Sequence, residues 1–295
     1  MPYAAHPDQA RDLAELTDLV AAGGVFVLTG AGLSTDSGIP DYRGRDGVRR
    51  VMPMQYGEFV GSSDARRRYW ARSFVGWQRF RAAEPNAGHR AVAAVQRHGL
   101  VDCLVTQNVD GLHQRGGSAS VVELHGSLGE VVCLTCGDRT ARVTVQEQLA
   151  EANPGFADEV VAEPGGSQVS SQIRPDGDIV LAGELVDVFR APRCLLCGAD
   201  TLKPDVVFFG ESVPRARVDH CLAALDASRS VLVLGSSLAV MSGYRFVRRA
   251  AARGIPIAVV TRGATRGDGE ATLRLDAPLT PTLQALVDTL DGALA

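Results

Sequence analysis

The chain has 295 residues, of which 45% are hydrophobic and 22% are charged, and its formal net charge is -4. This composition is typical of a globular protein with one large domain or two smaller ones. The small negative charge argues against a nucleic-acid-binding surface, and no apolar run approaches the roughly 20 residues that a membrane-spanning helix needs. The N-terminal residues lack the basic and apolar regions of a signal peptide, so we expect a cytoplasmic protein.

A buried strand followed by a glycine-rich turn is the first strong motif. Residues 25–29 form a continuous apolar run, as in a parallel strand buried on both faces. Gly30 and Gly32 allow a sharp turn and the approach of a ligand, and Ser34 with the polar residues after it can cap a helix whose N–H groups face a phosphate. A tight turn without a ligand has the same pattern. Because position 35 is threonine and not the third glycine of a dehydrogenase fingerprint, we expect a dinucleotide site of another geometry.

Apolar strands and helices alternate along the rest of the chain. The predicted strands cover 25–29, 101–106, 121–124, 206–209, 230–234 and 256–260, and the predicted helices cover 8–22, 85–98, 216–227, 240–253 and about 280–290. Residues 45–85, rich in arginine and aromatic side chains, predict a helical insertion with a local core. Residues 151–178 predict a mobile insertion or long loop. The alternation predicts an α/β fold with a doubly wound parallel sheet and a ligand crevice at the carboxyl ends of its strands.

Polar residues follow several predicted strands. Asn108 and Asp110 come after the strand that ends at Thr106, and His125 comes after the strand over 121–124. Since the carboxyl ends of parallel strands share one edge, we expect these residues to lie near Ser34. His125 is a candidate general base, although a histidine at a strand end is more often structural. The other histidines indicate local hydrogen bonding for His113 and surface or helix-end positions for His6, His89, His98 and His220.

Four of the six cysteines form two similar Cys-x-x-Cys-Gly motifs. Cys133 and Cys136 are separated by 57 residues from Cys194 and Cys197. Four thiolates complete a tetrahedral zinc site with no open position, so we expect one structural Zn²⁺. The separation exceeds the usual distance of about 15–20 residues, which a long loop tolerates. Two redox dithiols or plain buried cysteines are the alternatives, and the remaining two are expected to be inert core thiols: Cys103 and Cys221.

Several motifs occur in a fixed order along the chain: Gly30-Ala31-Gly32-Leu33-Ser34, Gly38-Ile39-Pro40-Asp41-Tyr42-Arg43, Thr106-Gln107-Asn108-Val109-Asp110-Gly111-Leu112-His113, His125-Gly126, the cysteine pairs and Gly235-Ser236-Ser237. Their combination resembles the sirtuins, a family of NAD-dependent protein lysine deacylases, over roughly residues 10–290. Further motifs are similar to the class II branch: Tyr69-Trp70-Ala71-Arg72, Pro175-Asp176-Gly177-Asp178, the run from Lys203 to Gly210, and Ser242-Gly243-Tyr244-Arg245-Phe246.

The resemblance implies a two-part molecule with NAD and an acyl-lysine between its parts. A Rossmann-like NAD-binding domain would comprise 1–44, 86–127 and 204–295, with the helical insertion at 45–85. A small zinc-binding domain would cover 128–203 and include the flexible insert 151–178.

The resemblance also implies roles for named residues. The catalytic residues would be His125, Asn108 and Asp110. The NAD-binding residues would be Gly30, Ala31, Gly32, Ser34, Ile39, Asp41, Tyr42, Arg43, Gln107, Asn108, Asp110, Gly235, Ser236, Ser237, Thr261, Arg262, Gly263 and Leu279. The backbone of the substrate would pair with Val207, Phe208, Gly210 and Glu211 as an added strand, and the zinc ligands would be Cys133, Cys136, Cys194 and Cys197.

The implied reaction gives nicotinamide, O-acyl-ADP-ribose and deacylated lysine, with His125 taking a proton from a ribose hydroxyl. We expect acyl-lysine proteins as substrates, acetyl-lysine by default, and a monomer that binds neither nucleic acid nor membrane. Tyr42 stands where phenylalanine is commoner, and Tyr69 with Arg72 suggests the hypothesis that an acidic acyl chain is accepted. The alternatives are a protein ADP-ribosyltransferase using the same site, a nicotinamide dehydrogenase, and a non-enzymatic zinc-ribbon binding module.

Overall fold

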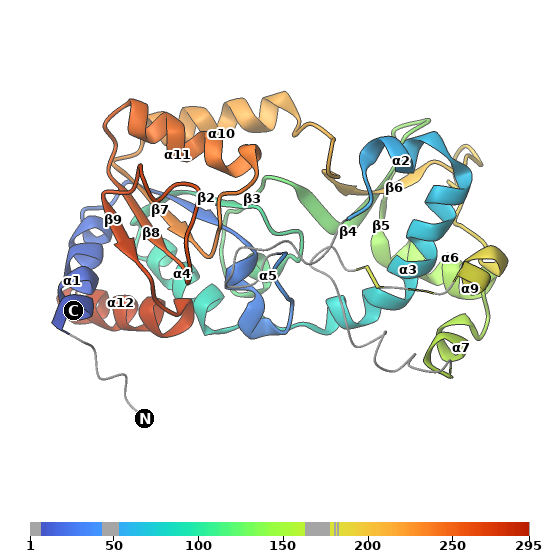
Figure 1. Cartoon of the computed structure of the whole chain (residues 1–295), viewed down its shortest axis with the longest axis horizontal. Helices are drawn as coiled ribbons and strands as arrows, with labels where there is room; N and C mark the ends of the chain where they lie inside the picture. The colour runs from blue at the N-terminus through green and yellow to red at the C-terminus, as the bar shows by residue number, and fades with distance from the viewer. Residues whose placement is uncertain (1–6, 43–52, 163–177, 180, 182, 295) are drawn as a thin grey trace.

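The computed structural model describes residues 7–42, 53–162, 178–179, 181 and 183–294 (Figure 1). Six strands form a sheet in the order β3-β2-β1-β7-β8-β9, and every neighbouring pair is parallel. Their bounds are β1 Val25–Thr29, β2 Val101–Thr106, β3 Val122–Glu123, β7 Ser230–Leu234, β8 Ile257–Val260 and β9 Leu273–Leu275. Strands β2 and β3 lie on one side of β1, and β7, β8 and β9 lie on the other. The strand order therefore reverses between β1 and β7, and such a switch point is where doubly wound sheets bind ligands.

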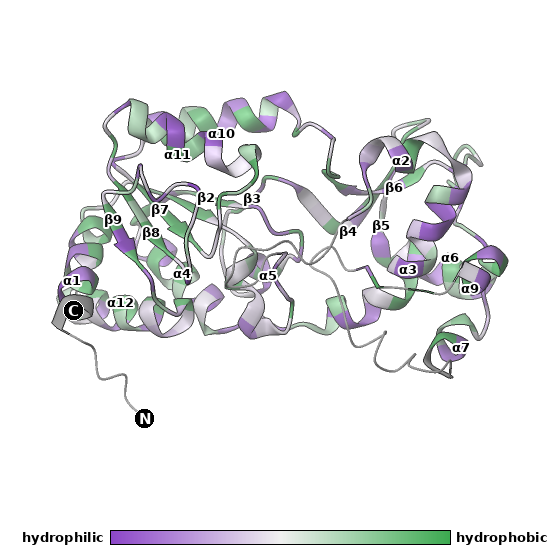
Figure 2. Ribbon diagram, in the orientation of Figure 1, coloured by the Kyte–Doolittle hydropathy of each residue, from purple (hydrophilic) through white to green (hydrophobic). Residues whose placement is uncertain are grey.

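Helices cover both faces of this sheet, because β1 is apolar on both sides. Val25 and Val27 pack toward α1 (Pro7–Ala21), α4 (Ala87–Arg97) and α12 (Leu279–Leu294). Phe26 and Leu28 pack toward α10 (Arg215–Ala227) and α11 (Met241–Ala252). In Figure 2 the strands of the sheet are accordingly hydrophobic along most of their length.

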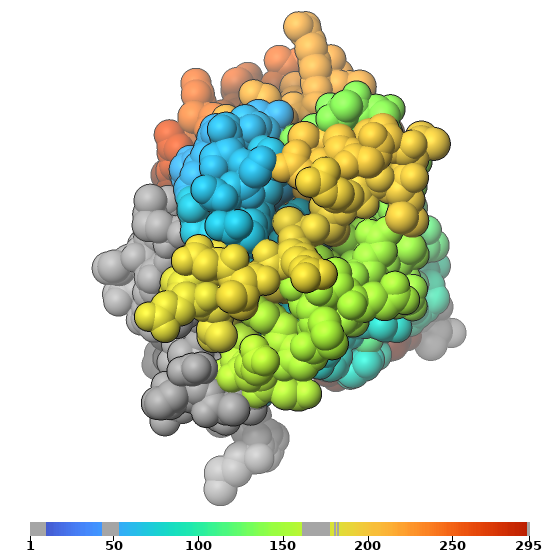
Figure 3. Space-filling view, turned by 90° about the vertical axis from the view of Figure 1, so that its right-hand side faces the viewer, coloured from blue at the N-terminus to red at the C-terminus, as the bar shows by residue number. Residues whose placement is uncertain are grey.

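A second, antiparallel sheet of three strands lies beside the first, in the order β5-β4-β6. It consists of β4 (Gly126–Cys133), β5 (Arg139–Ala141) and β6 (Leu202–Val206), and it is accompanied by α2 (Tyr56–Gly61), α3 (Ser63–Ala82), α6 (Arg142–Ala152), α7 (Phe156–Ala162) and α9 (Gly183–Val188). Figure 3 shows this end of the molecule, with α2 and α3 in blue beside the segment that precedes β6 in gold.

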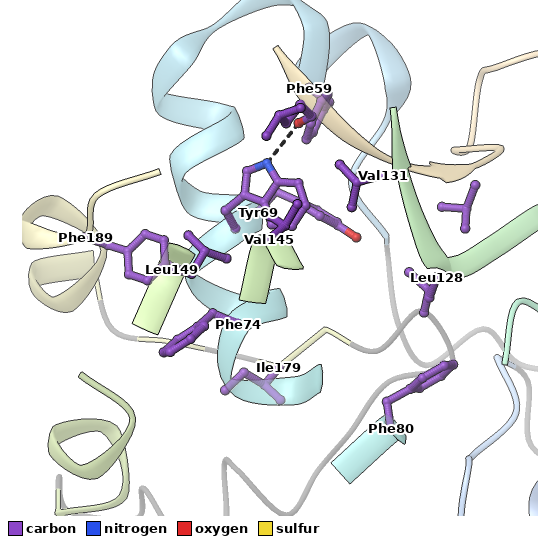
Figure 4. Packing of buried hydrophobic residues seen from close by; sticks show 14 of the residues in the cluster. Phe59, Tyr69, Phe74, Phe80, Leu128, Val131, Val145, Leu149, Ile179 and Phe189 are labelled. Atoms are coloured by element: carbon purple, nitrogen blue, oxygen red, sulfur yellow. Dashed lines mark hydrogen bonds between the residues drawn. The ribbon is translucent and has the colours of Figure 1, made fainter. Parts of the chain in front are cut away.

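The aromatic side chains of α3 form the centre of a core that this sheet shares. Trp70 is fully buried and its indole Nε1 donates a hydrogen bond of 2.9 Å to the Leu202 carbonyl of β6. Phe74 and Phe189 lie near each other in Figure 4, with ring centroids 5.9 Å apart. The prediction of a core for these aromatic residues is confirmed, but the core is not local to 45–85, because it joins α3 to the small sheet.

One predicted strand is wrong, and one strand of the large sheet was not predicted. Residues 206–209 are not the fourth strand of the parallel sheet, because Val206 ends β6, which pairs with β4 in the antiparallel sheet, and Phe209 forms only an isolated bridge with Gln55. The apolar run misled the prediction, since the strand itself contains Lys203, Pro204 and Asp205. The sixth strand of the large sheet is instead β9, a three-residue edge strand with an arginine at its centre that gives almost no sequence signal.

The segment 151–178 also differs from the predicted loop where it is described. Residues Phe156–Ala162 form α7, whose Phe156 is buried against Phe189. The Pro175-Asp176-Gly177 part of the class II motif lies outside the described residues. In the described part of the chain, no helix combines the length and the hydropathy needed to cross a membrane.

Candidate functional site

A cleft of about 1400 Å³ runs along the carboxyl ends of β1, β2, β7 and β8 and is closed on the other side by the loop after β6. Most of the predicted cofactor-binding residues line it: Gly30, Ala31, Gly32, Ser34, Ile39, Asp41, Tyr42, Gln107, Asn108, Asp110, Gly235, Ser236, Ser237, Thr261, Arg262 and Leu279. Gly263 does not line it, and its N–H donates to Asp276 Oδ1 at 3.1 Å. Arg43 lies outside the described residues.

The glycine loop after β1 packs backbone to backbone on the loop after β7. The Gly32 N–H donates to the Gly235 carbonyl at 2.9 Å. A Cβ at Gly30 would lie 2.8 Å from Ser236 Cβ, and a Cβ at Gly32 would lie 2.8 Å from the Gly235 oxygen. The two glycines are therefore required by this close approach, whether or not a ligand is bound.

The prediction that Ser34 and its neighbours cap a helix is wrong. Residues Ala31–Leu33 and Thr35–Ser37 form two short 3₁₀ turns, neither of which has a side-chain cap. Ser34 instead faces the polar residues after β2. Its Oγ donates to Asp110 Oδ2 at 2.7 Å and accepts from Asn108 Nδ2 at 3.0 Å.

Ser34, Asn108 and Asp110 thus form one network at the switch point. Asn108 Nδ2 also lies 3.1 Å from the Gly30 carbonyl, and Asp110 Oδ1 accepts from the Leu112 N–H at 2.9 Å. Burial raises the pKa of Asp110, although these hydrogen bonds oppose the shift. The network fixes the side chains that face the cleft, so a ligand there meets preorganised polar groups.

His125 lies at the same edge, between β3 and β4, with both ring nitrogens engaged. Its Nδ1 is 2.9 Å from the Gln107 carbonyl oxygen and its Nε2 is 2.8 Å from Ser242 Oγ. A carbonyl oxygen can only accept a hydrogen bond, so Nδ1 carries the proton and Nε2 presents its lone pair. Burial lowers the pKa of His125, and the charges of Arg217 and Arg245 lower it further. The imidazole is therefore neutral at pH 7 and able to accept a proton.

Two further histidines lie beneath the glycine loop. His89 lies at the N-terminal end of α4, one of its two predicted positions, but it is buried and not at the surface. Its Nδ1 accepts from the Asn86 N–H at 3.3 Å, and its Nε2 lies 3.5 Å from Ser34 Oγ. Burial lowers the pKa of His89 to about 4 and that of His113 to about 3. His113 Nε2 is 2.9 Å from Thr29 Oγ1, so both rings are neutral supports of the site. The signal that sequence reasoning missed is the capping box formed by Asn86 and His89.

The loop after β6 closes the cleft and carries the four predicted substrate-binding residues, which all line it: Val207, Phe208, Gly210 and Glu211. The Val207 N–H donates to the His125 carbonyl at 2.7 Å, and the Phe208 N–H donates to Glu211 Oε2 at 2.8 Å. The backbone of the loop is thereby hydrogen-bonded to the backbone of His125 and to the side chain of Glu211.

Lys203 anchors the loop after β6 through its buried ammonium, a role that could not be predicted from the motif between Lys203 and Gly210. The ammonium is buried, donates to the Val206 carbonyl at 2.6 Å, and lies 3.2 Å from Glu211 Oε2. It also lies 4.9 Å from the centre of the Phe208 ring. Burial lowers the pKa of Lys203, and the Glu211 carboxylate opposes that shift.

The structure does not bring Tyr69 and Arg72 together at the cleft. Tyr69 lines the cleft and packs on Phe59 and Phe208 with ring centroids 5.4 and 5.3 Å apart, respectively. Arg72 does not line it, and its Nε is buried without a hydrogen-bond partner.

The four motif cysteines form one cluster, the only group of three or more candidate metal-ligating side chains found in the described residues, with all Sγ atoms within 4.8 Å of one another. Cys133 Sγ and Cys197 Sγ are 3.6 Å apart, and Cys136 Sγ and Cys194 Sγ are 3.7 Å apart. Tetrahedral bonds of about 2.3 Å to Zn²⁺ place sulfur atoms roughly 3.8 Å apart, so the cluster fits the ion.

The two cysteine turns have the same backbone geometry. The Gly137 N–H donates to the Cys133 carbonyl and the Gly198 N–H to the Cys194 carbonyl, both at 2.8 Å. The φ angles of the two glycines are +78° and +74°. Cys103 and Cys221 are buried away from this cluster, and burial raises the pKa of Cys103 to about 11 and of Cys221 to about 12, as expected for inert thiols.

The model of the Sir2 family matches residues 30–242. NAD-dependent protein deacetylase 1 of Streptomyces coelicolor is 54% identical over 290 residues, which cover 98% of this chain and 93% of that protein. NAD-dependent protein deacylase Sirt4 of Drosophila melanogaster is 46% identical over 283 residues, covering 94% and 87%. A solved structure of Sir2Tm bound to a propionylated peptide has a TM-score of 0.72 and 25% identity, covering 96% of this chain and 99% of the other.

Proposed function

The chain belongs to the Sir2 family and is an NAD-dependent protein deacetylase, and from this premise we propose how its residues carry out the reaction. When bound, NAD supplies the nicotinamide that leaves and the ribose that receives the acyl group. The observation that carries the proposal is the neutral His125, whose Nε2 lone pair lies in the same cleft as the network of Ser34, Asn108 and Asp110.

The residues of the large sheet would bind NAD. Ser236, Ser237, Thr261 and Arg262, with Leu279 through its backbone, would hold the adenosine side, and Ala31, Gly32 and Ser34 would hold the phosphates and a ribose. Ile39, Asp41, Tyr42 and Arg43 would hold the nicotinamide, and Gln107, Asn108 and Asp110 would position its ribose. The arrangement at a topological switch point supports this assignment, because the residues described line one continuous cleft there.

His125 would act as the general base. Its Nε2 would accept the proton of a ribose hydroxyl, while Nδ1–H continues to donate to the Gln107 carbonyl. A base of this kind contributes roughly 100-fold to 10,000-fold to a rate. The lowered pKa keeps the lone pair available at neutral pH.

The acyl-lysine would enter beside the loop after β6. Val207, Phe208, Gly210 and Glu211 would pair with the substrate backbone as an added strand, and the anchored geometry of that loop supports this reading. Acetyl is the acyl group we propose by default. Because Arg72 does not line the cleft, the hypothesis of an acidic acyl chain has no support from the geometry.

The cysteine cluster would hold one structural Zn²⁺ that stabilises the fold of the small sheet and takes no part in the reaction. We assign 1–44, 86–127 and 204–295 to the NAD-binding domain, 45–85 to the helical insertion and 128–203 to the small domain, including the insert 151–178. The cores on the two faces of the large sheet are separate from the core of the small sheet, which supports the boundary of the NAD-binding domain, whereas the helical insertion shares its core with the small domain. The similarity to Sirt4 supports the class II branch, and we propose a cytoplasmic monomer that acts on acyl-lysine proteins.

The test is a stoichiometry measurement on the wild-type protein with NAD and peptides that carry different lysine acyl groups. We expect one nicotinamide and one O-acyl-ADP-ribose per deacylated lysine, with the acetyl peptide among the best. Nicotinamide release without deacylated peptide would instead indicate ADP-ribosyl transfer. No NAD-dependent change in the peptide would contradict the proposal.

A further inference from the structure

The hydroxyl of Ser242 is hydrogen-bonded to Nε2 of His125, the nitrogen that would act as the base. Ser242 Oγ lies 2.8 Å from His125 Nε2. Since Nδ1 carries the ring proton, the hydroxyl is the donor and the Nε2 lone pair is the acceptor. Ser242 and His125 both line the cleft, so a hydroxyl group that binds His125 Nε2 there has to replace the Ser242 hydroxyl at that nitrogen.

The start of α11 carries this hydroxyl close to Gln107. Ser242 is the second residue of α11 and is not its N-cap, which is Val240. The next residue, Gly243, packs so closely on Gln107 that a Cβ would come within 2.5 Å of its Oε1. Gln107 also supplies the carbonyl that accepts from His125 Nδ1. The two hydrogen-bond partners of the ring therefore belong to elements that contact each other directly.

The charged groups near His125 do not orient the ring by attraction. Arg217 and Arg245 both carry positive charge, and both disfavour the protonated imidazole. Arg217 is directed to the Leu124 carbonyl, to which its Nη1 donates at 3.1 Å. The orientation of the neutral ring therefore depends on its two hydrogen bonds, those to Gln107 and Ser242.

We propose that Ser242 is a positioning residue for the general base. In the NAD-free enzyme its hydroxyl holds the His125 imidazole in the tautomer and orientation that the reaction requires, and a ribose hydroxyl then replaces it at Nε2. In the exchange Ser242 would keep its own proton, and His125 Nε2 would take the proton of the ribose hydroxyl, whose O–H bonding pair would stay on the ribose oxygen. This inference rests on the proposed role of His125.

Three variants separate positioning from a general effect on the fold. Ser242→Ala removes the hydroxyl, and Ser242→Thr keeps it. Thr289→Ala is the matched control, because it removes an exposed hydroxyl on α12 that donates to the Ala285 carbonyl of its own helix.

The first readout needs no NAD and no turnover. In ¹⁵N-labelled wild-type protein, the imidazole resonances of His125 should show a single Nδ1–H tautomer and a hydrogen-bonded Nε2. In Ser242→Ala the Nε2 resonance should move toward that of a free imidazole nitrogen, while Ser242→Thr and Thr289→Ala should resemble the wild type. An unchanged Nε2 resonance in Ser242→Ala would overturn the proposal.

The second readout separates the proton-transfer step from cofactor binding. Since a misplacement of about 1 Å can cost roughly 100-fold in rate, Ser242→Ala should lower kcat for deacetylation by about tenfold or more. It should leave the KM for NAD nearly unchanged. It should also leave the rate of nicotinamide exchange, in which labelled nicotinamide is incorporated into NAD, nearly unchanged, because this exchange needs no proton transfer to His125. Ser242→Thr should restore kcat. Equal losses in exchange and deacetylation would refute the positioning role. His125→Ala serves as a separate test: full activity in it would refute the base role while leaving the resonance result for Ser242 intact.

Discussion

The buried histidine pair makes a quantitative prediction about stability in acid. His89 and His113 are both nearly inaccessible to solvent, and their rings meet edge to face with centroids 5.1 Å apart. The pKa of each in the folded state is below the ordinary value of 6.5, at about 4 and about 3 respectively. A group whose folded pKa is depressed contributes stability above its unfolded pKa and loses it as the pH falls toward the folded pKa.

The magnitude follows from these values. Between pH 7 and pH 5 the unfolded state gains almost all of its histidine protons, whereas the folded state gains few. Each ring should therefore cost about 2 kcal/mol of unfolding free energy over this interval, or about 4 kcal/mol for the pair. That is a large part of the roughly 5–15 kcal/mol by which proteins are stable.

The assay is urea unfolding at pH 7 and pH 5 for the wild type and for His113→Gln, whose amide can still reach Thr29. The difference between the two pH values should be smaller in the variant by about 2 kcal/mol. Titrating groups common to both proteins, such as Asp110, cancel in this comparison. Equal pH dependence in the two proteins would show that His113 is not buried as a neutral ring.

Three further outcomes are expected. Lys203→Met should lower the unfolding free energy by roughly 3–5 kcal/mol, because it leaves the Glu211 carboxylate without its cationic partner. It should also raise the KM for the peptide more than the KM for NAD. The double variant with Glu211→Gln should recover part of the lost stability, and a fully stable single variant would contradict the anchoring role. Cys194→Ala should lose bound zinc and the near-ultraviolet signal of the small domain, whereas Cys221→Ala should keep the metal; full zinc content in Cys194→Ala would exclude the four-cysteine site. Gly243→Ala should displace the Gln107 side-chain amide from its hydrogen bond to Ser236 and lower kcat; a crystal structure with the Gln107 amide unmoved would contradict that reasoning.

Much of the fold could be predicted because its signals are local. The apolar run of β1, buried on both faces, and the similar cysteine turns depend on neighbouring residues alone, and both predictions are confirmed. The prediction of a strand at 206–209 in the parallel sheet was wrong, because a short apolar run does not show which strands it pairs with. The edge strand β9 could not be found, since its three residues are held by pairing with β8 and not by their own pattern.

The candidate site shows the same division. The glycine loop, Asn108, Asp110 and His125 could be placed together because all follow strands of one parallel sheet. His89 was missed because its burial depends on how α4 lies against the glycine loop. Ser242 could be quoted from its motif, but its contact with His125 joins residues 117 positions apart in the chain and becomes visible only in the folded structure.

The most direct test of the account is deacetylation of an acetyl-lysine peptide by His125→Ala, measured by mass spectrometry with NAD in excess. The account predicts that the variant keeps its zinc and its folded structure but forms deacetylated peptide at least about 100-fold more slowly than the wild type. A variant that deacetylates within twofold of the wild-type rate would contradict the assignment of His125 as the general base, and with it the mechanism proposed for this cleft.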